Sequence, residues 1–64
     1  MNSQAFSVQQ FCAAHGLSRA MFYILLRDVR APTVMKIGRR TLISAEAAAD
    51  WRRRMESETL ARTA

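Results

Sequence analysis

Apolar residues in the first part of the chain recur at spacings of three and four, which predicts amphipathic helices. The first apolar face consists of Val8, Phe11 and Cys12. Ser7 and Gln10 stand three residues apart at its start, the arrangement of a capping box that satisfies free N–H groups of a first helical turn. Gly16 is the residue type that ends helices in a left-handed conformation. We therefore expect a first helix over residues 8–15.

A second helical pattern follows after a short connection, and its buried face is expected to contain Phe22, Leu25, Leu26 and Val29. Ser18 is the candidate N-cap. Neither Gly nor Pro interrupts residues 19–29, and Pro32 is expected to stop the helix because a residue before proline avoids the helical conformation. Ala20 and Ile24 lie opposite the buried face. One neighbouring side of the helix carries Arg19, Tyr23, Arg27 and Arg30.

The period changes to that of β-strands after Thr33. Two β-rich runs at residues 34–37 and 40–43 flank Gly38-Arg39, which is typical of a two-residue hairpin loop. Since an isolated hairpin is barely stable in water, it must pack on the helices. Ser44 then caps a third helix. The buried face of this helix is expected to contain Ala47, Ala48, Trp51 and Met55.

The third helix carries charged pairs on its surface and loses its apolar pattern after Glu58. The acid–base pairs at a spacing of four are Asp50–Arg54 and Arg52–Glu56. We expect residues 59–64 to fray. The chain is interpreted as a single domain, residues 1–64, with its core at about residues 6–58. The order of helix, tight turn, helix, β-hairpin and helix predicts a mainly α fold with a small β-hairpin, which is a winged helix-turn-helix.

Composition excludes several function classes for such a fold. The 64 residues include ten Lys and Arg against five Asp and Glu, a formal net charge of +5. So short a chain has little room for a pocket of roughly 300 Å³ or more, so we expect neither an enzyme nor a small-molecule substrate. One cysteine, Cys12, and one histidine, His15, are too few for a disulfide framework or a four-ligand zinc site, so no metal or cofactor is expected.

Location and partner class follow from the same composition. No apolar run approaches the roughly 18–20 residues of a membrane span, so no membrane association is expected. A free thiol without a disulfide framework fits a cytoplasmic compartment. The net charge by itself suits nucleic acid, an anionic membrane or an acidic protein equally well. The arrangement of the basic residues, nine of which are Arg, must therefore decide between these partners.

Two separate elements present basic side chains. Ser18 and Arg19 stand at the N-terminal end of the second helix, which in a helix-turn-helix enters the major groove with that end near the base edges. Arg39 and Arg40 stand at the hairpin tip, from which they can lie along the phosphate backbone or enter a minor groove. The alternative is a set of solvated surface charges, and two basic elements in one winged topology favour the DNA interpretation.

Three other features have structural explanations. Trp51 could stack on a base, but its spacing from Ala47 and Met55 favours a place in the core. Residues 52–54 are three consecutive Arg that cannot all point one way on a helix, so a solvated face with ion pairs is favoured over a second DNA contact. Cys12 is typical of a small buried hydrophobic residue.

These elements resemble a known family. The segments that carry the resemblance are Leu17-Ser18-Arg19, Phe22-Tyr23, Leu25-Leu26, Pro32, the run Lys36-Ile37-Gly38-Arg39-Arg40-Thr41-Leu42-Ile43 and the Ala-rich helix ending at Trp51. Over about residues 6–51 they are similar to AlpA-type regulators and small excisionases of phages and integrative elements, which are winged helix-turn-helix proteins with a MerR/excisionase-like fold. The resemblance implies DNA binding by the second helix and the wing, in the bacterial cytosol or nucleoid.

The resemblance also implies one of two roles. Members of the family either regulate transcription or act as recombination directionality factors, which bend attachment-site DNA and bias a recombinase toward excision. The chain departs from the family pattern at Met21, Ile24 and Val29, where a small polar residue, a basic residue and Gly are commoner. Ile24 could meet a thymine methyl group, belong to a protein interface, or be covered by a domain that wraps further than the pattern indicates.

We therefore expect a sequence-specific binder of double-stranded DNA from a mobile element. The expected DNA contacts are Ser18, Arg19, Ala20, Tyr23 and Arg27 in the major groove and Lys36, Arg39, Arg40 and Thr41 on the wing. One module of this size offers roughly 600–1,000 Å² to DNA, so we expect cooperative self-association on DNA. The resemblance further implies an integrase or recombinase as a partner. The alternative is a protein-binding adaptor that uses the Met21 and Ile24 surface without binding DNA.

Overall fold

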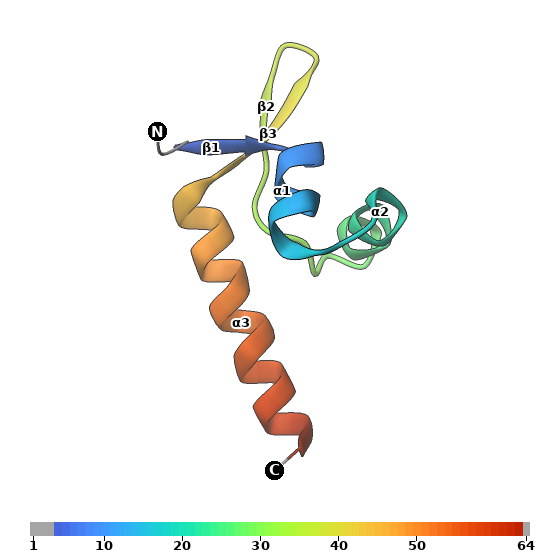
Figure 1. Cartoon of the computed structure of the whole chain (residues 1–64), viewed down its shortest axis with the longest axis vertical. Helices are drawn as coiled ribbons and strands as arrows, with labels where there is room; N and C mark the ends of the chain where they lie inside the picture. Colours follow the sequence, from blue (N-terminus) through green and yellow to red (C-terminus); the bar gives the residue numbers. More distant parts are fainter. Residues whose placement is uncertain (1–3, 64) are drawn as a thin grey trace.

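The helical and strand patterns of the sequence both appear in the folded chain (Figure 1). The computed structural model describes residues 4–63. In chain order the elements are β1 (Ala5–Ser7), α1 (Val8–His15), α2 (Arg19–Arg27), β2 (Met35–Ile37), β3 (Arg40–Ser44) and α3 (Ala45–Thr63). Within the described residues the fold is mainly helical, with three helices and a three-stranded antiparallel sheet. The predicted class of helices with a small β-hairpin is confirmed at this level.

The caps of α1 and the start of α2 are those that the sequence predicts. The Ser7 hydroxyl accepts a hydrogen bond from the Gln10 backbone N–H (3.1 Å), and the Gln10 side chain accepts one from the Ser7 N–H (2.9 Å), which completes the capping box. Gly16 ends α1 at a φ of 66°. The Ser18 hydroxyl accepts a hydrogen bond from the Met21 N–H at 3.0 Å. These signals succeed because each depends on only a few neighbouring residues.

The sheet contains a strand, β1, that the sequence pattern does not predict. It pairs antiparallel with β3, with Phe6 opposite Ile43, so β3 is the central strand and the order is β1-β3-β2. The Gly38-Arg39 loop is confirmed, because Ile37 pairs with Arg40 across it. A strand of three residues is too short to show alternation, and its partner lies far along the chain. The β1 pairing anchors β3, while the loop between β2 and β3 projects beyond the helices (Figure 1).

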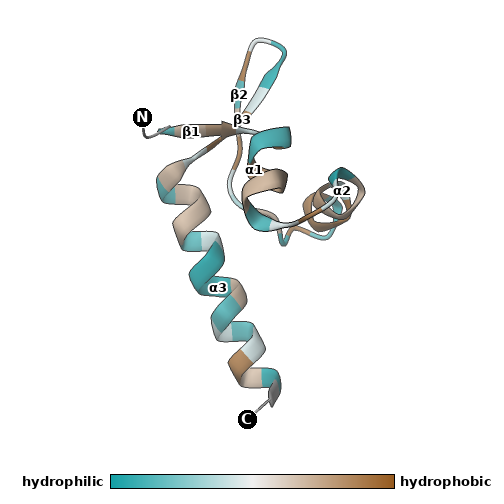
Figure 2. Cartoon of the chain, viewed as in Figure 1, coloured by the Kyte–Doolittle hydropathy of each residue, from teal (hydrophilic) through white to brown (hydrophobic). Residues whose placement is uncertain are grey.

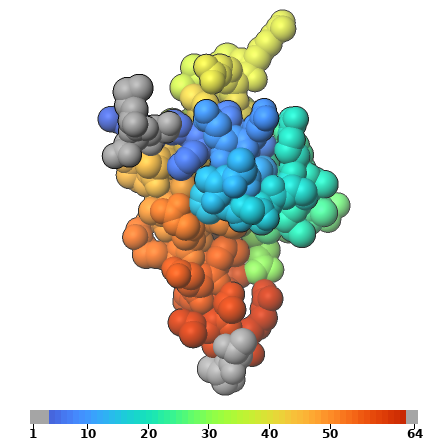
Figure 3. Space-filling view, in the orientation of Figure 1, coloured from blue at the N-terminus to red at the C-terminus, as the bar shows by residue number. Residues whose placement is uncertain are grey.

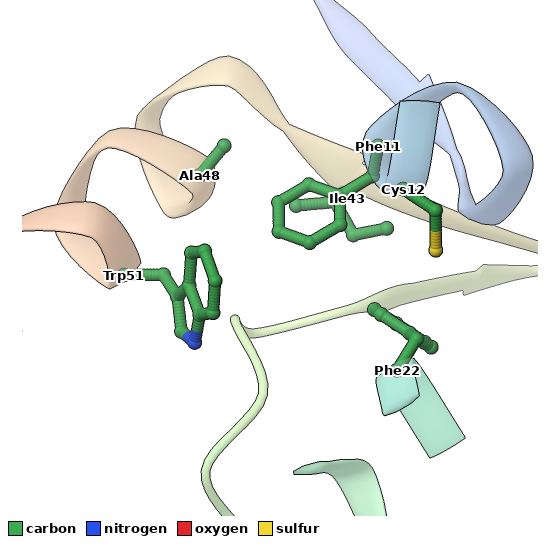
Figure 4. Close-up of a cluster of buried hydrophobic side chains, with 6 residues drawn as sticks. All are labelled: Phe11, Cys12, Phe22, Ile43, Ala48 and Trp51. Carbon is green, nitrogen blue, oxygen red and sulfur yellow. The ribbon is translucent and has the colours of Figure 1, made fainter. Parts of the chain in front are cut away.

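A small aromatic core holds the helices against the sheet (Figure 4). The fully or largely buried apolar residues are Phe11, Cys12, Phe22, Ile43, Ala48 and Trp51. The ring of Phe11 lies 5.8 Å from that of Phe22 and 5.3 Å from that of Trp51, both edge to face. The indole N–H of Trp51 donates to the carbonyl of Arg30 at 2.7 Å. The prediction that Trp51 belongs to the core is confirmed, and its polar atom is satisfied there.

Helix α2 ends earlier than predicted, through a Schellman motif. The N–H of Arg30 donates to the Leu25 carbonyl (2.8 Å), and the N–H of Val29 donates to the Leu26 carbonyl (3.2 Å). Val29 adopts the left-handed conformation that this motif requires, at a φ of 58°. In that conformation the chain leaves the helix after Arg27, so the expected extent of residues 19–29 is wrong.

This early end also changes the expected buried face of α2. Phe22 is fully buried and Leu25 half-buried, whereas Leu26 is exposed and Val29 is 87% exposed. The placement of Leu26 and Val29 in the core is therefore wrong. Leu26 lines an open groove together with Val29, and the left-handed backbone of Val29 turns the chain away from the helical stripe. Pro32 does not stop the helix, which has already ended; it is instead buried in the connection to β2.

Helix α3 begins as predicted and runs further. The Ser44 hydroxyl accepts a hydrogen bond from the Ala47 N–H at 3.0 Å, as expected of an N-cap. The helix then continues through Thr63, beyond the point after Glu58 where we expected fraying. Its C-terminal half is mostly hydrophilic (Figure 2), and its end lies at the opposite end of the molecule from the hairpin tip (Figure 1). No helix among residues 4–63 is long and apolar enough to cross a membrane.

The arginines of α3 make other contacts than the two predicted ion pairs, which are both wrong. Arg53 pairs with Asp50 along the helix, whereas Arg52 bonds His15 of α1 and Arg54 donates to the carbonyl of Ala31. A second ion pair of α3 joins Glu58 to Arg30 in the segment after α2. Arg30 therefore belongs with α3 and not with the basic side of α2. Arg52 and Arg54 bond groups of α1 and of the segment after α2, and these contacts replace the expected ion pairs along the surface of α3.

Candidate nucleic-acid interface

The net positive charge lies in the part of the chain that precedes α3. Residues 1–44 contain six basic residues and one acidic residue, whereas residues 45–64 contain four of each. The net charge of +5 therefore comes from the segment that forms α1, α2 and the hairpin. These elements occupy the upper part of the face seen in Figure 3, with α3 below them. A concentrated field of this kind attracts polyanions more strongly than a dispersed one.

Most cations of α2 and the hairpin also differ from the others in having no partner, Arg27 with its contact to Asp28 being the exception. Most cations outside these two elements contact another group, as the ion pairs of Arg30 and Arg53 illustrate. Among residues 4–63, those that form neither an ion pair nor a side-chain hydrogen bond are Arg19, Lys36, Arg39, Arg40 and Arg62. Four of these five belong to α2 and the hairpin. Their donors are thus available to an external acceptor.

Arg19 and the hairpin arginines line one hollow. Its volume is about 310 Å³, and its lining residues are Arg19 and Tyr23 of α2, Arg39, Arg40 and Thr41 of the hairpin, and Ser7, Val8 and Gln9 at the start of α1. The structure therefore brings together five of the nine residues that the sequence predicts as DNA contacts. Guanidinium groups from α2 and the hairpin surround one open hollow together with hydroxyl groups. Such a surface is suited to an anionic group.

The remaining four predicted residues lie outside this hollow. The Ser18 hydroxyl caps α2, and Arg27 at the end of the helix has its Nε 3.3 Å from the carboxylate of Asp28. Ala20 is exposed on the outward side of α2. Lys36 lies across the hairpin from Thr41, so the two side chains share one side of the sheet. Of the four, only Lys36 is therefore adjacent to a residue of the hollow.

Three residues at the start of α1 join the hollow although the sequence does not predict them as contacts. Ser7, Val8 and Gln9 reach it because β1 pairs with β3 and sets the start of α1 beside the hairpin. The capping box marks this helix start in the sequence. Its proximity to the hairpin depends on the strand pairing, for which there is no local signal.

The outward surface of α2 exposes two large apolar side chains. Met21 is 43% exposed and Ile24 is 42% exposed. The interpretation in which the domain wraps over Ile24 is therefore wrong. Ile24 remains available to a partner, which leaves the thymine methyl and the protein interface as the two explanations.

Cys12 and His15 have structural partners. Cys12 is buried, with its thiol 3.8 Å from the carbonyl of Ser18. The ring of His15 stacks on Phe11 at 4.1 Å. In the part of the chain that the structure describes, no three His, Cys, Asp or Glu side chains come close enough together to hold a metal ion.

A larger groove lies elsewhere and contains none of the nine predicted residues. Its volume is about 800 Å³, and it runs between α3 and the segment that follows α2. The expectation that so short a chain has little room for a pocket of roughly 300 Å³ or more is therefore wrong, because an open groove forms between elements that do not pack fully against each other. Leu26, Val29 and Val34 form its apolar side, and Arg53 and Arg54 lie on its α3 side. Both arginines have partners within the chain, in contrast to those of the smaller hollow.

Comparisons with protein-family models, with curated proteins and with solved structures found no match to this chain.

Proposed function

We propose that this chain is a non-enzymatic, double-stranded-DNA-binding protein of the winged helix-turn-helix class. In this proposal α2 lies in the major groove and the β2–β3 hairpin is the wing. The observation that carries the proposal is the convergence of unpaired arginines from two separate elements, Arg19 of α2 with Arg39 and Arg40 of the hairpin, on one open hollow.

Physical chemistry favours DNA as the polyanion that meets this surface. Each guanidinium placed on a phosphate releases a condensed counterion, and this release is a major source of affinity for DNA. A helix of the dimensions of α2 fits the major groove, and a projecting hairpin can follow the backbone beside it.

The biological role we propose follows the sequence resemblance. An AlpA-type regulator or an excisionase-like directionality factor of a mobile element would bind specific sites, with several copies acting together and, for excision, with an integrase or recombinase as partner. Such a protein would act in the bacterial cytosol or nucleoid. Footprinting on the DNA that flanks its own gene distinguishes the two roles, because protection beside an attachment site supports excision and protection over a promoter supports regulation.

A second function is favoured by one observation, the exposure of Met21 and Ile24. A protein-binding adaptor would bury this apolar surface against another protein and would use the positive charge for solubility. A mobility-shift titration at moderate salt separates the two functions. DNA binding predicts a saturable shift of a duplex, whereas an adaptor predicts no saturable shift on any duplex.

A further inference from the structure

The centre of the outward face of α2 is apolar. Successive helix residues are rotated by about 100°, so Ala20 and Ile24 project on the side opposite Phe22, which is fully buried. Both are exposed, and Met21 lies beside them with a similar exposure. Figure 2 shows that α2 is largely hydrophobic although only one of its residues, Phe22, is fully buried. An exposed apolar surface of this kind indicates a binding site for a partner.

The surroundings of this face indicate that its occupant is a polyanion. Arg19 and Tyr23 stand on its hairpin side, where they line the hollow with the hairpin arginines. Arg27 stands at its C-terminal end with a side chain that is 74% exposed. The apolar centre is thus framed by cationic groups on the segment that carries the whole net charge. Charge complementarity favours DNA over an apolar protein surface, since a protein partner would have to desolvate these guanidinium groups.

The base edges in the major groove offer one apolar feature to such a face. They present hydrogen-bond donors and acceptors, with the C5 methyl group of thymine as the exception. An isoleucine pressed against any other edge would remove water from polar groups without replacing their hydrogen bonds. Against a thymine methyl group it buries apolar surface on both sides.

We propose that Ile24 is a specificity-determining residue that packs against a thymine methyl group in the major groove, so that the sites bound by this chain carry thymine opposite the centre of α2. This inference rests on the proposed DNA binding. It assigns the sequence preference to the apolar residues of α2, while Arg19 and the hairpin arginines supply affinity that does not depend on the DNA sequence.

Uracil substitution tests the inference directly, because deoxyuridine keeps every hydrogen-bonding group of thymidine and lacks only the methyl group. A site is first selected from a library of random 20-base-pair duplexes with the full chain. Thymines of the selected duplex are then replaced by deoxyuridine one at a time, and each Kd is measured. We expect one replacement to weaken binding about four-fold, the effect of one buried methyl group.

Two variants complete the experiment. Ile24→Ala shortens the exposed side chain without altering the core, and it should bind the thymine and uracil duplexes equally. Leu60→Ala removes a similarly apolar side chain that is 70% exposed near the far end of α3, and it should retain the four-fold difference of the wild type. The four Kd values, for the wild type and Ile24→Ala on the thymine and the uracil duplex, form a double-mutant cycle. The uracil effect in the wild type divided by that in Ile24→Ala measures the direct contact between Ile24 and the methyl group.

The other possible results contradict either the role of Ile24 or DNA binding itself. Equal binding of thymine and uracil duplexes by the wild type, or a selected site without thymine, overturns the role of Ile24 and leaves DNA binding in place. The same is true if Ile24→Ala retains the full methyl effect. Recovery of no duplex by the selection overturns the proposed function and this inference with it.

Discussion

Arg52 of α3 and His15 of α1 are joined by a hydrogen bond of 3.0 Å between the guanidinium Nη1 and the imidazole Nε2. A guanidinium has only donors, so Nε2 is the acceptor. The other ring nitrogen, Nδ1, lies 2.8 Å from the carbonyl of Phe11, which can only accept. His15 is therefore held as the Nδ1–H tautomer. Through this residue α3 is bonded to α1, and the His15 ring itself stacks on the ring of Phe11.

This assignment can be tested by NMR on the neutral imidazole. The two-bond ¹H–¹⁵N correlations of His15 should show a protonated Nδ1 and an unprotonated Nε2, the less common tautomer of free histidine. The Arg52→Ala variant removes the donor to Nε2 and should shift the population toward Nε2–H. A wild-type spectrum dominated by Nε2–H would contradict the Arg52–His15 bond.

The left-handed Val29 predicts that this protein can be stabilised at one position. A β-branched residue at a φ of 58° is strained, and glycine adopts this conformation without a steric penalty. Because the Val29 side chain is 87% exposed, its removal loses little packing. Val29→Gly should raise the free energy of unfolding by about 1 kcal/mol, after the larger chain entropy of glycine is allowed for.

Thermal or urea unfolding followed by circular dichroism measures this change. For a domain of this size 1 kcal/mol corresponds to an increase in Tm of roughly 4–8 °C. Val29→Thr is the matched control, since it keeps the β-branched side chain and the strain, and its Tm should equal that of the wild type. A lower Tm for Val29→Gly would contradict the Schellman geometry.

Arg19 shares its hollow with Arg39 and Arg40, which favours the DNA backbone as its contact. Arg19→Ala should therefore weaken binding to a selected site and to random duplexes by similar factors, and it should reduce the slope of log Kd against log salt by about one unit. The measurement is a salt titration on both kinds of duplex. A loss of about 1–3 kcal/mol on the selected site with little loss on random DNA would instead assign Arg19 to a base edge, as its place at the start of α2 first suggests.

The small size of the proposed interface predicts assembly on DNA. A single module offers roughly 600–1,000 Å² to DNA, so useful affinity requires several copies. Sedimentation of the free chain should give a monomer, and the affinity per site should rise on duplexes that carry one, two and three sites. A stable dimer without DNA, or one constant affinity per site, would contradict cooperative assembly and leave DNA binding unaffected.

Local signals account for what the sequence predicts of the fold. The caps at Ser7, Gly16 and Ser18 and the Gly38-Arg39 loop each depend on a few adjacent residues, and all four occur as expected. The end of α2 does not occur where the sequence predicts it, because the Schellman motif there uses Val29 in a conformation that normally favours glycine.

Long-range pairing accounts for what the sequence does not predict. No period marks the three residues of β1, and their pairing with β3 is what places the start of α1 beside the hairpin. The cations of the hollow could be predicted because helical spacing and the hairpin loop determine which side chains project. The contribution of Gln9 could not, since it requires knowledge of the register of two distant strands.

In the proposed function, the cationic surface of α2 and the hairpin binds double-stranded DNA. The most direct measurement is the salt dependence of duplex binding by two double variants that remove the same charge. Arg39→Ala with Arg40→Ala removes the two unpaired arginines of the hairpin and leaves Lys36, whereas Arg53→Ala with Arg62→Ala removes two exposed arginines of α3.

The wild type should bind with a negative slope of log affinity against log salt, and the hairpin variant should bind more weakly with a slope that is shallower by about one to two units, near 0.9 for each lost phosphate contact. The α3 variant should keep the wild-type slope. Circular dichroism verifies that both variants are folded. Equal slopes for the wild type and a folded hairpin variant, or an equal reduction in both variants, would contradict DNA binding by this surface.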